Sequence, residues 1–323
     1  MTLTALQIKQ LNNMNAAAQR AQLGTLVGST EPYGQSYFDD PIAGSDSNAG
    51  TSWASAFLTM GKALTSVSTL GSIFFVGDVR EEIVASNLKF DVSIIGCGSL
   101  HHPDSPGALY NPGAAMWRAP ASPTAVTPLL ELKGRGWKFY NIAFDCPVDS
   151  GAIKLTRNAL GTTSEFDASH ATFENCRFLS GAYGIIDNGG ANNITIKNCE
   201  FAGMTTAAIY GSSTAVANPR AWKVFDNMFP ANVSGLGNAT HMDLSLNESI
   251  VSRNFFGTVV STALYVDLTG GNGNMVTDNF MMGVYQAVDY VAGTGDSWVG
   301  NQTIDLSRGT ETTAAGLSVK VPA

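Results

Sequence analysis

The sequence reads Val224-Phe-Asp-Asn, Val251-Ser-Arg-Asn and Val276-Thr-Asp-Asn in three successive segments, each an apolar strand residue that leads to Asn. The same pattern connects seven residues: Asn141, Asn175, Asn198, Asn227, Asn254, Asn279 and Asn301. Their separations are 34, 23, 29, 27, 25 and 22 positions. This period is too short for a propeller blade and too irregular for a leucine-rich horseshoe. The repeat therefore predicts a solenoid of strands.

Asparagine suits the turns of such a solenoid for a physical reason. Equivalent turn residues of stacked coils lie about 4.8 Å apart, which is the strand spacing. At that distance an amide can donate to one coil and accept from the next, and Asn tolerates the left-handed backbone of sharp turns. We therefore expect the seven Asn residues to form one structural ladder. The pattern resembles that of pectin-lyase-like right-handed parallel β-helices and covers about residues 72–305. The resemblance implies an all-β fold of about seven or eight coils.

Composition and charge narrow the possible partners. The chain has 323 residues, 34 of them Gly, and a formal net charge of −8. Nucleic acids and anionic membranes call for clustered Lys and Arg, so neither is expected as a partner. The four cysteines do not form a disulfide pattern, because Cys176 and Cys199 directly follow repeat Asn residues and are expected in the core. We expect no cofactor and no metal, and synthesis in a cytoplasm.

Two segments precede the solenoid. Residues 4–22 predict a capped amphipathic helix, with Leu6, Leu11 and Met14 on the apolar face that we expect to attach the protein to a partner. The second segment contains Gly44-Ser-Asp-Ser-Asn and then apolar residues at helical spacing from Trp53 to Val67. It resembles the entry motif of many phage and bacterial β-helix proteins, in which a helix caps the first coil.

These segments give the expected organisation of the chain: an anchor and linker (1–35), an entry motif with its capping helix (36–71), the β-helix (72–305) and a tail (306–323). The entry segment also holds the acidic cluster Asp39, Asp40 and Asp46. This cluster lacks the regular ligand spacing of a calcium loop, so no metal site is assigned to it.

Candidate catalytic residues come from a column of acidic side chains. Asp243, Asp267 and Asp289 each follow apolar residues in three successive coils. Carboxylates one coil apart lie near the separation used by retaining glycosidases. However, the Asn-Thr-Asp and Gly-His-Gly signatures of the polygalacturonase-like β-helices are not present. We expect no catalytic site, and keep the three Asp residues as the alternative. His241 is the one histidine close to this column.

Two classes of function remain. The first is a non-enzymatic virion protein of a bacteriophage, assembled in the host cytoplasm and held on the capsid as a decoration, cement or head-fibre subunit, as a homo-oligomer that we expect to be a trimer. The second is a tailspike-like protein that binds or cleaves host surface polysaccharide. The Pro-rich loop 101–128 is long enough to serve in a contact with another protein or to cover its own coils.

Overall fold

A computed structural model describes residues 34–85, 88–98, 115–123, 127–146, 151–158, 166–211, 218–230, 237–259, 264–282, 289–305 and 310–311. The expected helix at 4–22 with Leu6, Leu11 and Met14 lies outside the described residues, as do most of the loop 101–128 and most of the tail 306–323.

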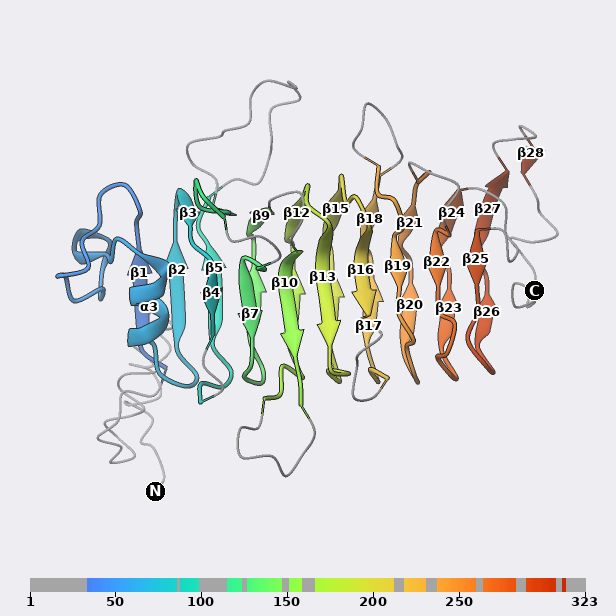
Figure 1. Cartoon of the computed structure of the whole chain (residues 1–323), viewed down its shortest axis with the longest axis horizontal. Coiled ribbons are helices and arrows are strands. Elements are labelled where there is room, and N and C mark those ends of the chain that lie inside the picture. Colours follow the sequence, from blue (N-terminus) through green and yellow to red (C-terminus); the bar gives the residue numbers. More distant parts are fainter. Residues whose placement is uncertain are drawn as a thin grey trace, which may run out of the picture.

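The described chain forms a three-sheet parallel β-helix, which confirms the expected fold (Figure 1). Sheet A contains β1 (Ser36–Asp39), β2 (Ser72–Phe75), β5 (Ser93–Gly96), β8 (Lys138–Tyr140), β11 (Thr172–Glu174), β14 (Thr195–Lys197), β17 (Lys223–Phe225), β20 (Ile250–Ser252), β23 (Met275–Thr277) and β26 (Ser297–Val299). Because β1 pairs with β2, the entry segment belongs to the first coil.

The other two sheets complete each turn of the coil. Sheet B contains β3 (Asp78–Arg80), β6 (Met116–Arg118), β9 (Ala143–Asp145), β12 (Arg177–Leu179), β15 (Glu200–Ala202), β18 (Met228–Phe229), β21 (Phe255–Phe256), β24 (Phe280–Met282), β27 (Gln302–Asp305) and β28 (Thr310–Glu311). Sheet C contains β4 (Ile83–Val84), β7 (Leu130–Leu132), β10 (Gly151–Thr156), β13 (Tyr183–Asn188), β16 (Ala207–Gly211), β19 (Met242–Asp243), β22 (Val266–Asp267) and β25 (Tyr290–Val291). Among the described residues, sheet C thus has eight strands, and sheets A and B have ten each.

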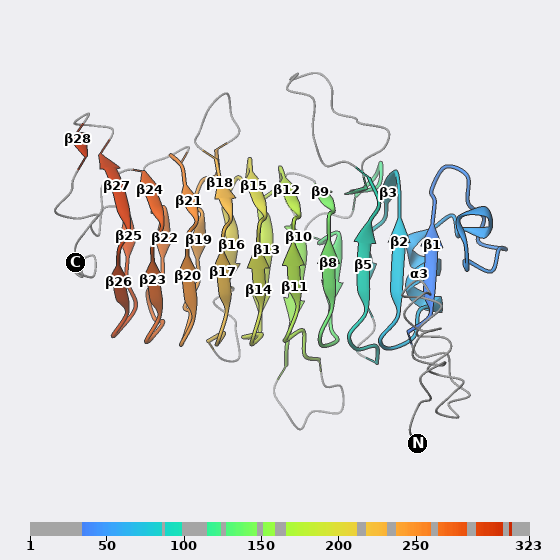
Figure 2. The ribbon, with the colours of Figure 1, turned by 180° about the vertical axis from the view of Figure 1, so that it is seen from behind.

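The core is a stack of side chains in register along the axis. In sheet B the rings of Phe178 and Phe201 lie 4.5 Å apart at 4°, and Phe201 stacks in turn on Phe229 at 5.1 Å. These side chains are fully buried, and each contributes about 1.5–3 kcal/mol through burial. Seen from behind, sheet A forms a continuous wall of short strands (Figure 2). The stack fixes which side of every strand faces solvent.

The N-terminal end is closed by a shorter helix than the sequence predicted. A 3-10 helix at Trp53–Ser55 and helix α3 at Met60–Ser66 replace the continuous helix expected from Trp53 to Val67. Phe57 instead forms a β-bridge with Asp39, which holds the chain extended between the two helices. Met60, Ala63 and Leu64 of α3 are buried against the first coil as expected, whereas Trp53 is 43% exposed.

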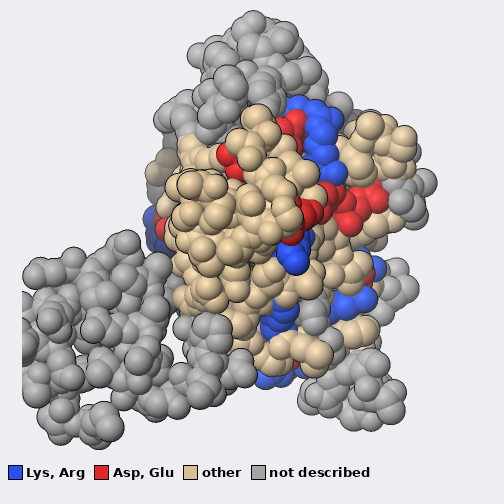
Figure 3. Space-filling view, turned by 90° about the vertical axis from the view of Figure 1, so that its left-hand side faces the viewer, with Lys and Arg blue, Asp and Glu red and all other residues tan. Residues whose placement is uncertain are grey.

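Figure 3 looks onto this end of the molecule. Acidic side chains gather to one side of it, next to Lys and Arg side chains, and the rest of the described surface there is largely uncharged. Among the described residues, no helix has the length and apolar character needed to cross a membrane.

Candidate functional site

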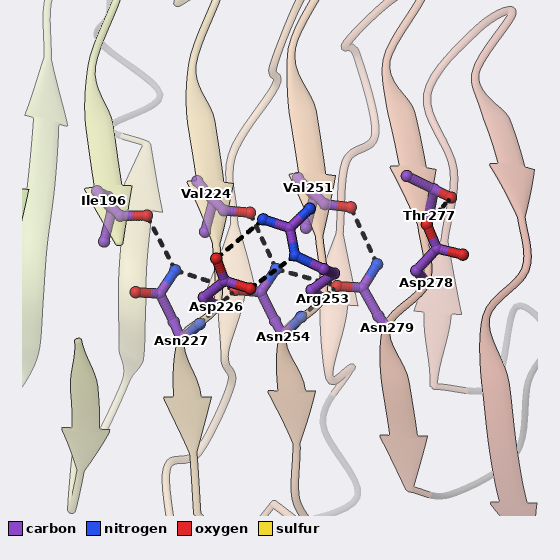
Figure 4. Close-up of polar contacts among 10 residues, drawn as sticks. All are labelled: Ile196, Val224, Asp226, Asn227, Val251, Arg253, Asn254, Thr277, Asp278 and Asn279. Carbon is purple, nitrogen blue, oxygen red and sulfur yellow. Dashed lines mark hydrogen bonds and ion pairs between the residues drawn. The ribbon is translucent and has the colours of Figure 1, made fainter. Parts of the chain in front are cut away.

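Four of the seven repeat Asn residues form a buried ladder at the corner between sheets A and B (Figure 4). The Nδ2 atom of Asn227 donates to Asn254 Oδ1 at 3.0 Å, Asn254 donates to Asn279 at 3.0 Å, and Asn279 donates to Asn301 at 2.9 Å. Each Oδ1 also accepts the main-chain N–H of the coil before it, beginning with Cys199 N to Asn227 Oδ1 at 2.9 Å. The ladder therefore satisfies buried main-chain groups that would otherwise lack partners.

The other three Asn residues lie one position earlier in the turn, which corrects the single column expected from the sequence. Asn141, Asn175 and Asn198 have φ values of 57°, 53° and 52°, in the left-handed region. Later coils place Asp226, Arg253, Asp278 and Gly300 at the same point of the turn. Asn175 Nδ2 donates to Asn141 Oδ1 at 3.0 Å, so a short exposed ladder exists here as well. In these coils the inner position is occupied by Ile142, Cys176 and Cys199.

A second buried ladder lies at the corner between sheets C and A, and the sequence analysis missed it. Asn274 Nδ2 donates to Asp296 Oδ1 at 2.9 Å, and Asn274 Oδ1 accepts Ser249 N at 3.1 Å. Ser249 Oγ then accepts Trp222 N at 3.0 Å. Each residue immediately precedes a strand of sheet A, and this position is the signal that could have revealed them. The sequence analysis did not find this column because its residue type changes from one coil to the next.

The outer face of sheet C holds two of the three candidate Asp residues side by side. Asp243 of β19 pairs in register with Asp267 of β22. The next residue in this column is Val291, not Asp289, because β25 pairs Val291 with Asp267. The structure thus places Asp289 outside the column. The Asp267 carboxylate accepts the main-chain N–H of Thr269 at 2.8 Å, so it also stabilises its own turn.

Two tyrosines continue this outer face toward the N-terminus. Tyr210 pairs in register with Asp243, and its ring centroid lies 4.8 Å from that of Tyr183. Burial, and then the neighbouring Asp267, raises the pKa of Asp243. Burial also raises the pKa of Tyr210, with smaller contributions from Tyr183 and Asp243. We call Tyr183, Tyr210, Asp243 and Asp267 the sheet C cluster.

His241, which directly precedes β19, lies in the core beside Phe229 and Phe256 and not on the outer face with the sheet C cluster. It is fully buried, its Nε2 atom lies 2.7 Å from Gly257 O, and its Nδ1 atom lies 3.3 Å from Asn238 Nδ2. Since a carbonyl only accepts, Nε2 carries the proton and Nδ1 accepts from Asn238. Burial lowers the pKa of His241 to about 4, so the imidazole is neutral at pH 7. His241 therefore does not form a catalytic pair with Asp243.

The sheet C cluster has a limited set of chemical possibilities. A carboxyl group with a raised pKa beside a second carboxyl group is the pattern of a glycosidase acid and its partner. Paired tyrosine rings on an open face offer apolar surfaces with hydroxyl groups at their edges, which suits contact with a sugar. The arrangement of side chains is compatible with glycan binding, and hydrolysis would require the Asp267 carboxylate to leave the Thr269 amide or to act while bound to it.

The acidic cluster at the entry segment serves mainly to hold the cap. Asp46 accepts the main-chain N–H groups of Leu58 and Thr59, and Glu81 accepts those of Met60 and Gly61. Asp39 is fully buried, and burial, reinforced by Glu81, raises its pKa to about 8. Within the described ranges no group of three or more His, Cys, Asp or Glu residues is arranged to hold a metal ion.

Comparisons with known proteins identify the fold and nothing finer. No protein-family model matches the sequence, and no curated protein matches it. Among solved structures, pectate lyase Pel9A aligns over 90% of this chain and 78% of its own, with a TM-score of 0.52 and 15% identity. XylC, in complex with xylose, aligns over 82% of this chain and 68% of its own, with a TM-score of 0.50 and 10% identity.

A viral protein, ORF18 of Geobacillus virus E2, aligns over 95% of this chain and 66% of its own, with a TM-score of 0.40 and 13% identity. The chain therefore has the pectin-lyase-like parallel β-helix fold, which it shares with pectate lyase Pel9A. Sequence identities this low show the fold alone.

Proposed function

We propose that the protein is a non-enzymatic structural subunit of a phage virion, held on the capsid as a decoration, cement or head-fibre protein. The observation that carries this proposal is that its buried polar groups join one coil to the next. The Asn227–Asn301 ladder and the Ser249–Asp296 ladder lie at two corners of the same coils. Such an interior produces a stiff rod, which is what a particle-bound spacer or cement subunit requires.

The arrangement of the carboxylates supports a role without catalysis. Only Asp243 and Asp267 of the expected column lie in register, and Asp267 is bound to the Thr269 amide. A strand-end Asp that accepts turn amides has a structural function in most folds. The raised pKa of Asp243 follows from its burial first and from Asp267 second. Neither observation requires a bound substrate.

Attachment to the particle is assigned to the N-terminal segment on sequence grounds. The sequence of residues 4–22 predicts a helix with Leu6, Leu11 and Met14 on its apolar face, and the entry motif after them resembles that of phage β-helix proteins. The described body has its own core and its own cap in α3, so folding and attachment are expected to be separable. A homotrimer assembled in the host cytoplasm is part of the same proposal.

The test uses full-length protein and particles that lack the native subunit. Leu6→Asp/Leu11→Asp should reduce binding to the particles at least tenfold, because each change places a charge where an apolar contact is expected. Asn12→Asp/Gln19→Asp is the matched control, since it adds the same charge on the opposite face of the expected helix and should bind normally. Equal binding by both variants would remove residues 1–35 as the anchor.

A second candidate function is glycan binding by the sheet C cluster, and the adjacent Tyr183 and Tyr210 rings, tilted at 31° to each other, favour it. In this case Tyr183→Ala/Tyr210→Ala should lose retention on immobilised host surface polysaccharide. Tyr140→Ala, on the outer face of sheet A, is the control. Release of reducing ends by the wild type, lost in Asp243→Asn/Asp267→Asn, would overturn the non-enzymatic proposal.

A further inference from the structure

The outward-facing side chains of sheet B change from charged to apolar along one column. From strand to strand the column contains, in register, Arg177, Glu200, Met228, Phe255 and Phe280. Arg177 and Glu200 form an ion pair at 2.8 Å, as expected of a face in water. Met228 is 49% exposed, and the half-buried rings of Phe255 and Phe280 stack 5.2 Å apart. The later members of the column therefore form an apolar ridge on the surface.

Sheet A shows the same change in the same coils. One outward-facing column there contains, in register, Thr172, Thr195, Lys223, Ile250 and Met275. Ile250 is 40% exposed and Met275 is 51% exposed. Ile250 belongs to the coil of Phe255, and Met275 belongs to the coil of Phe280. Each of these coils thus presents one apolar side chain on either side of the corner between sheets A and B.

A surface of this kind is typical of a protein interface. Single exposed apolar side chains are normal on a folded protein, whereas a contiguous apolar patch marks a contact with another molecule. Interfaces are also enriched in Phe, Met and Arg relative to the rest of the surface. We use the name A–B corner patch for Met228, Ile250, Phe255, Met275 and Phe280. Arg253 lies at the corner between its two sides.

The spacing of the patch indicates the kind of partner. Its members recur once per coil, because Ile250 pairs in register with Met275 and Phe255 pairs in register with Phe280. Successive members are therefore separated along the axis by the strand spacing of about 4.8 Å. A partner fills such a patch evenly when its own side chains recur at the same interval in the same direction. Another copy of this chain, lying alongside with its axis parallel, has that repeat.

The charges at the corner suit parallel copies. The exposed residues at the turn in successive coils are Asp226, Arg253 and Asp278, and Arg253 donates to Asp226 at 2.7 Å (Figure 4). When several corners meet at one axis, a layer of Arg253 side chains lies between a layer of Asp226 and a layer of Asp278. Opposite charges are then neighbours along the axis, whereas a column of one sign would repel its copies.

The corner is sharp, because only Arg253 and Asn254 separate β20 from β21. We propose that three copies meet at this corner with parallel axes, so that the sheet A side of each patch packs on the sheet B side of the next copy. Such a head-to-tail contact closes into a ring. The inference deepens the proposed function, because the number of copies rests on the homotrimer proposed there and the patch supplies its interface.

The state of association tests the patch. Full-length protein should sediment as a trimer, and Ile250→Lys/Met275→Lys should raise its dissociation constant at least a hundredfold, because each change buries an unpaired charge in the contact. Val84→Lys/Phe90→Lys is the matched control, since it replaces two exposed apolar side chains outside the patch and should remain trimeric. Circular dichroism checks that each variant is folded. A monomeric wild type, or the same association in the two variants, would overturn the proposal.

A cross-link tests which faces meet, in a Cys97→Ser background, because the other three cysteines are buried. Met275→Cys/Phe280→Cys places one thiol on each side of the corner. A short bis-maleimide joins two thiols when each sulfur adds to a ring carbon and the thiol proton passes to the neighbouring carbon. We expect at least fivefold more covalent trimer than from Val291→Cys/Phe280→Cys, in which Val291 lies on the outer face of sheet C.

Single cysteines distinguish the ring from a two-fold contact. Met275→Cys alone and Phe280→Cys alone should not join chains, because a ring contact brings two different faces together. Covalent dimers from either single variant, in a yield equal to that of the pair, would show a two-fold contact and overturn the ring. The result is also separable from particle attachment. A monomeric wild type that still binds particles would overturn this interface alone, whereas a trimer that depends on the patch but binds no particles would count against the virion role alone.

Discussion

Replacing Asn254 by Ala is the sharpest test of the buried ladder. The side chain makes four hydrogen bonds: Nδ2 donates to Val224 O at 2.9 Å and to Asn279 Oδ1 at 3.0 Å, and Oδ1 accepts Asn227 N and Asn227 Nδ2 at 3.0 Å each. Asn254 is 2% exposed, so water does not replace these partners without opening the corner.

The expected loss can be estimated from these bonds. The main-chain N–H of Asn227 loses its acceptor, and the other groups each lose one bond, which together cost about 4 kcal/mol. For a chain of this length that corresponds to a fall of about 6 °C in the melting midpoint. Neighbouring coils lose their shared partner at the same corner, so the unfolding transition should also become less cooperative.

The matched control is Asn198→Ala, measured by the same thermal melts followed by circular dichroism. Asn198 is exposed and has φ of 52°, so its replacement costs only the left-handed backbone term of about 1 kcal/mol. Asn198→Gly should recover that loss, because Gly adopts this conformation freely. Equal losses for Asn254→Ala and Asn198→Ala would refute the division into an inner and an outer column.

Three further predictions concern titratable groups. Asp39 has a folded pKa of about 8 against about 3.9 when unfolded, so its contribution to stability declines as pH rises from about 4 to about 8. The advantage of Asp39→Asn in melts should grow over that range and then stay constant; a constant difference at all pH values would contradict it. His241, with a folded pKa of about 4, costs stability as pH falls from about 6.5 to about 4, and His241→Gln should flatten that decline in acid titrations. Asp243→Asn should melt at the same or a higher temperature than wild type at pH 7, because burial and Asp267 both disfavour the charged carboxylate; a lower midpoint would show an unrecognised partner.

The sequence was sufficient for the fold because the signal is repeated. An apolar strand followed by a turn residue recurs in every coil from Asn141 to Asn301, and one irregular member does not hide the period. The sequence does not show which of two adjacent turn residues faces the interior. Asn198-Cys199 and Asp226-Asn227 look equivalent when aligned on Asn, yet the inner positions are Cys199 and Asn227. Packing against the coils on either side decides that question.

The candidate site was harder to predict than the fold. Asp243 and Asp267 were expected together and do lie in register. Asp289 does not, because β25 places Val291, two residues further along the chain, opposite Asp267. The cap shows the same limit. Trp53 has helical spacing to Phe57, but the Phe57–Asp39 bridge outweighs local periodicity. The spacing of residues within one segment does not predict which distant segment it pairs with.

The mechanical resistance of this molecule depends on the direction of the load. Strands run across the long axis, and the hydrogen bonds that pair them run along it (Figure 1). A sideways load is therefore carried by covalent chain, while tension along the axis pulls on one coil boundary at a time, and the weakest boundary parts first. From Cys199 onward the amide ladder bridges each boundary at the A–B corner, whereas the earlier coils have Ile142 and Cys176 there. A rod of this kind would tear near its capped end and leave the Asn-rich half intact.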